Sequence, residues 1–116
     1  MSVGEDREAL ASALELLARE PVRQVPALPT FRRLAEEIAR GDDEVAVVDV
    51  RGLRAAGALT DTVTSLIEEM DACFSVLVDD RATAFTEAAL SEHVAWIELR
   101  ALARRTLMAL SSDRQA

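Results

Sequence analysis

The sequence predicts an all-α protein, a compact bundle of about four helices that forms one domain over residues 1–116. Three observations favour this fold class. All four glycines and all three prolines lie before residue 58, and because both residues interrupt regular structure, the second half can form long helices. Apolar residues recur there with helical spacing. Half of the residues are hydrophobic but only 3% are aromatic, a composition that suits close helix packing.

Charge and composition disfavour several classes of function. Acidic residues number 21 against 13 basic ones, all of them arginine, and the net charge is −8. Phosphate backbones and anionic membrane surfaces repel such a chain, so neither nucleic acid nor a membrane is expected as a partner. One cysteine and one histidine cannot form an internal disulfide or a structural zinc site. No cofactor and no metal are expected.

The sequence also favours a soluble cytoplasmic protein. The N-terminus is acidic, whereas a secretory signal is basic and then apolar. No apolar run approaches the ~20 residues of a membrane span. The lack of lysine, asparagine and tyrosine is typical of a GC-rich bacterial genome.

Two short helices are predicted in the N-terminal part. The first begins after Ser2, which can cap it together with Glu5, and ends before Pro21. The second begins at the cap Thr30 and ends at Gly41. Residues 21–29 contain every proline, and between the two helices they are predicted to form an extended Pro-rich connector. The apolar stripes are Leu10, Ala13, Leu14 and Leu17 in the first helix and Phe31, Leu34, Ala35 and Ile38 in the second.

Two long helices are predicted in the C-terminal half, over residues 60–78 and 84–110, with the break at residues 79–83. The polar residues 111–116 are expected to fray. The first long helix has one apolar stripe: Val63, Leu66, Ile67, Met70, Cys73, Phe74, Leu77 and Val78. The second has a stripe on each of two nearly opposite sides: Phe85, Trp96, Leu99, Ala103, Leu107 and Leu110, and then Leu90, Val94, Ile97, Ala101 and Met108.

An α/β alternative rests on the Val-rich residues 45–50. If residues 73–78 were a second strand, the chain would contain a small βαβ unit with Asp49, Asp79 and Asp80 at the strand ends, where small ligands and metals gather. Against this, two parallel strands are seldom stable alone. The helical stripe also continues in register through residues 73–78.

A second alternative is a helix-turn-helix DNA-binding regulator over residues 30–53. Its recognition helix would begin with Asp42, Asp43 and Glu44. Such a helix needs donors at its start to bind bases and phosphates, and carboxylates repel them. This alternative therefore ranks below the others.

The candidate site is a partner-binding strip on the last helix formed by His93, Trp96, Arg100 and Arg104. Arginine offers a planar fork for carboxylates, and tryptophan offers a large contact surface. Two chemical alternatives are weaker. Cys73 and His93 could form a thiolate–imidazole pair, but Cys73 belongs to the apolar stripe among acidic residues. The carboxylates Glu68, Glu69 and Asp71 are interpreted as a solvated face and not as a metal site.

The sequence therefore predicts a small non-catalytic helical interaction or regulatory module, such as an adaptor, inhibitor or accessory subunit. No convincing catalytic constellation is present, so an enzyme is not expected. A helix that is apolar on two sides needs a cover on both, and a second copy would supply one. The expected partners are itself, as a homodimer with the last helix near the twofold axis, and an unidentified protein.

Overall fold

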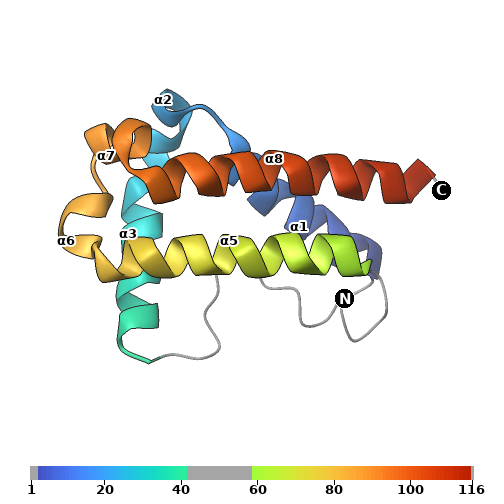
Figure 1. The fold of residues 1–116 in the computed structure, drawn as a ribbon, viewed down its shortest axis with the longest axis horizontal. Helices are drawn as coiled ribbons and strands as arrows, with labels where there is room; N and C mark the ends of the chain where they lie inside the picture. The colour runs from blue at the N-terminus through green and yellow to red at the C-terminus, as the bar shows by residue number, and fades with distance from the viewer. Residues whose placement is uncertain (1–2, 42–58, 116) are drawn as a thin grey trace.

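The computed structural model describes residues 3–41 and 59–115, and Figure 1 shows them as helices joined by short turns. Among these residues there is no strand, which confirms the all-α prediction. Residues 73–78 lie inside a helix, so the βαβ alternative loses its second strand, while residues 45–50 and Asp49 lie outside the described residues. The helices are α1 (Val3–Ala18), α2 (Pro21–Gln24), the 3-10 turn η1 (Val25–Ala27), α3 (Leu28–Ala39), α5 (Asp61–Asp79), α6 (Arg81–Ala84), α7 (Glu87–Glu92) and α8 (Val94–Gln115).

The long helices α5 and α8 lie side by side and antiparallel, and they form the main packing contact of the molecule (Figure 1). Helix α1 packs on α8, and α3 packs against the end of α5. Within the described residues, no helix combines the length and the hydrophobicity that crossing a bilayer requires.

An aromatic cluster fills the core where α3, α8 and the turn before α7 meet. The rings of Phe31 and Trp96 lie 5.2 Å apart, and Phe85 contacts Trp96 at 6.0 Å in an edge-to-face arrangement. Phe74 contacts Phe85 at 6.2 Å. All four rings are buried. The three phenylalanines and the single tryptophan of the chain therefore all serve the core.

Two predicted helix ends are confirmed by capping groups that act locally. The Thr60 hydroxyl oxygen accepts a hydrogen bond from the backbone N–H of Val63 at 3.3 Å, as an N-cap of α5 does. At the end of α3, Gly41 adopts a φ of +86°, the left-handed conformation that favours glycine. Its N–H donates to the carbonyl of Ile38.

The prediction that residues 21–29 are extended is wrong. The segment forms α2, η1 and the first residues of α3. Pro21, Pro26 and Pro29 each occupy one of the first two positions of a helical turn. At these positions the backbone N–H has no partner within the turn, so proline's missing donor costs nothing.

The prediction of one continuous helix over residues 84–110 is also wrong, because the chain leaves the helix at Phe85–Thr86 and again at His93. Side chains replace the lost backbone bonds. The Thr86 hydroxyl accepts from the N–H of Ala89 at 3.1 Å and caps α7. Helix α8 then runs to Gln115 and includes most of the segment that was expected to fray.

Candidate functional site

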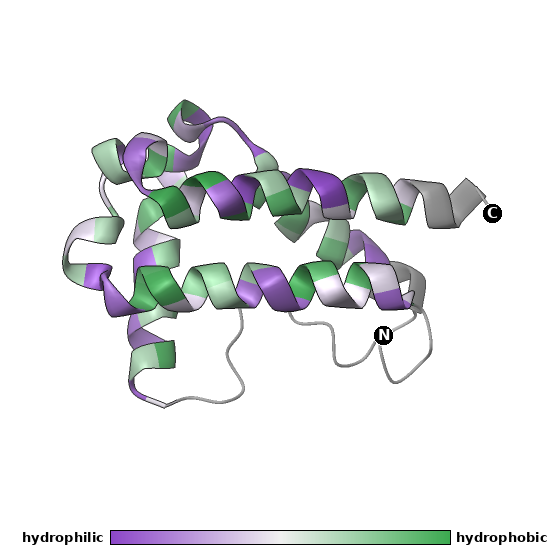
Figure 2. Cartoon of the chain, viewed as in Figure 1, coloured by the Kyte–Doolittle hydropathy of each residue, from purple (hydrophilic) through white to green (hydrophobic). Residues whose placement is uncertain are grey.

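The exposed side of α8 carries an apolar surface that no other described helix covers. Val94 is 64% exposed, Ile97 47% and Met108 72%, and Ala101 is exposed between them. These four residues, called here the α8 face, belong to the second stripe predicted for the last helix. Leu90, the fifth member of that stripe, is buried in α7. The hydropathy colouring of α8 in Figure 2 shows hydrophobic and hydrophilic residues alternating along its length.

The other predicted stripe lies in the core. Trp96, Leu99 and Ala103 are fully buried, Leu110 is nearly so, and Leu107 is half-buried. The two-sided pattern was therefore correct in one specific sense: one side packs inside the protein, while the other is open to solvent.

A groove runs beside the α8 face, between α5 and α8. It consists of two adjoining hollows that share Ala72, Cys73 and Glu98. Toward the start of α8 the lining continues with Val76, which is 47% exposed. Toward the end of α8 the lining includes Glu69, Ala101, Leu102 and Arg105. The groove and the α8 face together form one surface of mixed apolar and charged character.

Cys73 lies in this groove and is poorly suited to act as a nucleophile. Its thiol is 3.8 Å from the Glu98 carboxylate. Partial burial raises the pKa of the Cys73 thiol above its ordinary value, and the negative charges of Glu98 and Glu69 raise it further. The reactive thiolate is therefore disfavoured. His93 lines the same hollow, but its ring nitrogens bond elsewhere.

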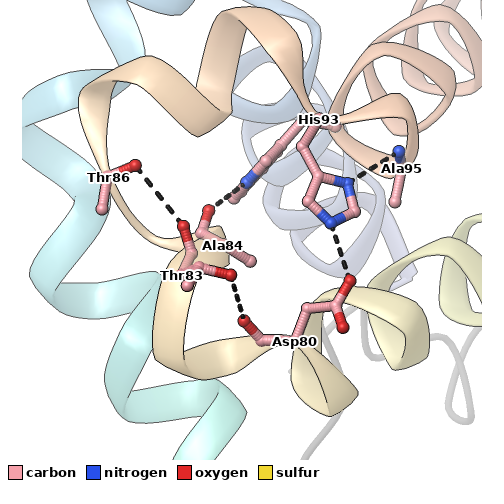
Figure 3. Close-up of polar contacts among 7 residues, drawn as sticks. Asp80, Thr83, Ala84, Thr86, His93 and Ala95 are labelled. Carbon is pink, nitrogen blue, oxygen red and sulfur yellow. Dashed lines mark hydrogen bonds and ion pairs between the residues drawn. The ribbon is translucent and has the colours of Figure 1, made fainter.

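His93 acts as a structural cap at the start of α8. Its Nδ1 accepts a hydrogen bond from the N–H of Ala95 at 3.1 Å (Figure 3). The neutral ring then carries its proton on Nε2, which donates to Oδ2 of Asp80 at 3.0 Å. One side chain thus begins α8 and ties it to the end of α5. The hydroxyls of Thr83 and Thr86 make further bonds in the same turn (Figure 3).

Trp96 and Arg100, two members of the predicted partner-binding strip, are buried. The Trp96 ring is fully enclosed, and its Nε1–H donates to the carbonyl of Ala84 at 2.8 Å. Arg100 is only 7% exposed. Its Nε donates to the carbonyl of Arg19 at 3.1 Å, and its Nη2 donates to Oε1 of Gln24 at 3.0 Å and to the carbonyl of Leu90 at 2.7 Å.

Burial lowers the pKa of the Arg100 guanidinium, and the nearby Arg104 lowers it further. Arg104 itself is exposed and donates from Nε to the carbonyl of Ala18 at 3.1 Å. The two arginines together satisfy carbonyls at the end of α1, where a helix leaves such groups without partners. His93, Trp96, Arg100 and Arg104 are therefore not one exposed strip; only Arg104 is open to solvent, and His93 is partly so.

The carboxylates considered as metal ligands are dispersed. Asp80 contacts His93, and Asp79 lines a different hollow beside Arg32 and Arg81. Burial raises the pKa of Asp71 to about 6, and the neighbouring Glu68 adds to this rise. Within the part of the chain that the structure describes, no three histidine, cysteine or acidic side chains lie close enough together to hold a metal ion.

The sequence pattern did not lead to a prediction of the charged residues beside the α8 face. Glu98 and Arg105 flank the α8 face, and Val76 of α5 lies outside the helical stripe of its own helix. The available signal was the spacing of Glu98 and Arg105, which are seven residues apart and so lie on one side of α8.

Searches of protein-family models, curated proteins and solved structures found no match to this chain.

Proposed function

We propose that this protein is a small non-catalytic helical interaction module that acts by protein–protein association through the α8 face and the adjoining groove. The single observation that carries the proposal is the exposure of Val94, Ile97 and Met108 on one side of a long helix. Exposed apolar side chains that share one face of a helix and have charged residues at its edge are typical of interaction sites. Because the backbone of a helix is already ordered, such a surface loses little conformational entropy on binding.

A binding role is favoured over catalysis by how the reactive side chains are used. His93 is occupied in capping α8, and Arg100 donates three hydrogen bonds inside the protein. The raised pKa of the Cys73 thiol disfavours its reactive thiolate form. His93 and Arg100 therefore stabilise the fold, while the α8 face offers apolar contact area with charged residues beside it.

The expected partners are a second copy of the chain and a further protein. The net charge of −8 supports a protein partner over nucleic acid, since phosphates would be repelled. Helices that bind through apolar side chains at positions i, i+3 and i+7 usually dock against another helix or into a hydrophobic groove. The positions of Val94, Ile97 and Ala101 follow this spacing.

The test compares two valine-to-aspartate variants. Val94→Asp places a charge in the α8 face, and Val22→Asp makes the same change at a valine of α2 that is 72% exposed. We expect light scattering to show loss of association for Val94→Asp alone, and affinity capture from the native cell to lose any bound protein for Val94→Asp alone. If both variants behave as wild type in both measurements, the proposed function is wrong.

A further inference from the structure

We propose that the α8 face binds the same face of a second copy, with the two α8 helices antiparallel and crossing at Ala101. This inference rests on the proposed function and specifies the geometry of one partner. It is carried by two independent features of the described residues: the order of large and small side chains along the α8 face, and the positions of Glu98 and Arg105 beside it.

The first feature is the placement of Val94 and Met108 at equal distances on either side of Ala101, the smallest residue of the α8 face. Val94 and Met108 each lie seven residues from Ala101, which is two helical turns or roughly 10 Å in each direction. A small residue at the crossing point lets two helices approach to about 8 Å. In an antiparallel pair centred on Ala101, Val94 of one chain meets Met108 of the partner subunit, and both exposed side chains become covered.

The second feature is the pair of opposite charges, Glu98 and Arg105, beside the α8 face. Glu98 and Arg105 are both exposed and both line the same hollow, so they lie on the same side of the α8 face. They are about 10 Å apart along the helix, too far for a direct ion pair. Glu69 of α5 lines this hollow too. Among the described residues, neither Glu98 nor Arg105 makes an ion pair.

In antiparallel and parallel pairs of α8, Glu98 and Arg105 lie next to different residues of the partner subunit. Ala101 lies three residues after Glu98 and four before Arg105. A twofold axis through Ala101 that reverses the helix direction therefore brings Glu98 to Arg105 of the partner subunit, and it does so twice. A parallel pair in register places the two copies of Glu98, and likewise of Arg105, on opposite flanks of the interface, so Glu98 does not meet Arg105 there. Since only the antiparallel pair brings these opposite charges together, charge complementarity favours it.

The first experiment reverses these charges and measures the dissociation constant of the dimer by sedimentation equilibrium. Glu98→Arg and Arg105→Glu should each raise it by about tenfold, because each turns two attractive contacts into repulsive ones. The double variant Glu98→Arg/Arg105→Glu should restore the wild-type value. Arg33→Glu, at an exposed arginine of α3, is the matched control and should leave the value unchanged. Unchanged values for both single variants would overturn the antiparallel geometry.

The second experiment reads the helix direction directly by cross-linking with a short bismaleimide in a Cys73→Ala background. A mixture of Val94→Cys and Met108→Cys chains should cross-link between the two types, and Ala101→Cys should cross-link to itself. Val94→Cys alone should not. A strong Val94→Cys self-cross-link would establish a parallel pair and overturn the proposal.

The two proposals fail separately. A chain that remains monomeric at every concentration overturns the self-pairing, yet the proposed function stands if Val94→Asp abolishes capture of a different protein and Val22→Asp does not. Circular dichroism of each variant provides the check on folding, because every altered residue except Cys73 is exposed and should leave the helical content unchanged.

Discussion

Arg100 shows how a charged side chain that looks suited to recognition can be part of the core. Its guanidinium joins α8 to the carbonyl of Arg19, the amide of Gln24 and the carbonyl of Leu90. Removing it leaves buried acceptors without donors, which costs more than the bonds themselves contributed. We expect Arg100→Ala to lower the free energy of unfolding by about 3 kcal/mol.

The neighbouring arginine supplies the comparison. Arg104 is exposed and donates a hydrogen bond of 3.1 Å to the carbonyl of Ala18, so Arg104→Ala should lower the free energy of unfolding by about 1 kcal/mol or less. Arg100→Lys should not restore the lost stability, because an ammonium group cannot reproduce the planar set of N–H donors of a guanidinium. Urea unfolding measures all three variants. Equal, small losses for Arg100→Ala and Arg104→Ala would show that Arg100 is not a structural residue.

The raised pKa of Asp71 predicts a specific pH dependence of the free energy of unfolding. Its pKa rises from an ordinary 3.8 to about 6 in the folded protein, chiefly because burial disfavours the carboxylate and also because Glu68 repels it. The folded state therefore binds the proton more tightly than the unfolded state does. The stabilisation from this group is present below pH 4 and is lost as the pH rises toward 6.

The variant Asp71→Asn isolates this effect. Relative to wild type, its melting temperature should be higher above pH 6, and the difference should shrink as the pH falls toward 4. Glu69→Gln, on the exposed side of the same helix, serves as the control because it removes one negative charge from α5 and leaves Asp71 in place. A constant difference between Asp71→Asn and wild type across this range would contradict the raised pKa.

At the scale of the helices, the breaks around α7 depend on side-chain caps. His93 caps α8 through Nδ1, so His93→Ala should lower the free energy of unfolding by about 1 kcal/mol, whereas His93→Asn should retain most of the stability because asparagine also caps well. Thr86→Ala should cost a similar amount at the start of α7. Thermal unfolding of the three variants is the measurement. Equal stability of the alanine and asparagine variants at residue 93 would argue against the cap.

Helix ends were predictable where their signals are local. Thr60 and Gly41 mark the start of α5 and the end of α3 because the groups that they satisfy lie within four residues. The break after α6 has a local cap at Thr86, but it also depends on contacts that are distant in the sequence. There the carbonyl of Ala84 accepts from Trp96, and the carbonyl of Phe85 accepts from Arg32 at 2.7 Å, across 53 residues of sequence. Contacts at that separation cannot be read from periodicity.

The candidate site was predictable in part. Helical spacing identified both apolar stripes of the last helix, including Val94, Ile97 and Met108. It could not tell which stripe is covered, because that depends on how α1 and α5 pack on α8. For the same reason Trp96 and Arg100 were assigned to a binding strip although they are buried. The sequence pattern thus defines the faces of a helix, and the tertiary packing decides which face remains open.

At the scale of the whole molecule, the packing of the described helices leaves one long side of α8 uncovered. Helix α5 covers one flank of α8 and α1 covers another, while the α8 face carries Met108 at 72% exposure. An apolar face of this kind is an aggregation hazard unless it has a partner. The proposed pairing with a second copy would cover this face and would also bring together the charges of Glu98 and Arg105.

The molar mass as a function of concentration tests this account most directly. In sedimentation equilibrium from low to high micromolar concentration, the wild-type protein should move from the 12.6 kDa of one chain toward twice that value. Val94→Asp should remain at the mass of one chain under the same conditions, while Val22→Asp should follow wild type. A wild-type mass of 12.6 kDa at every concentration would contradict self-association through the α8 face.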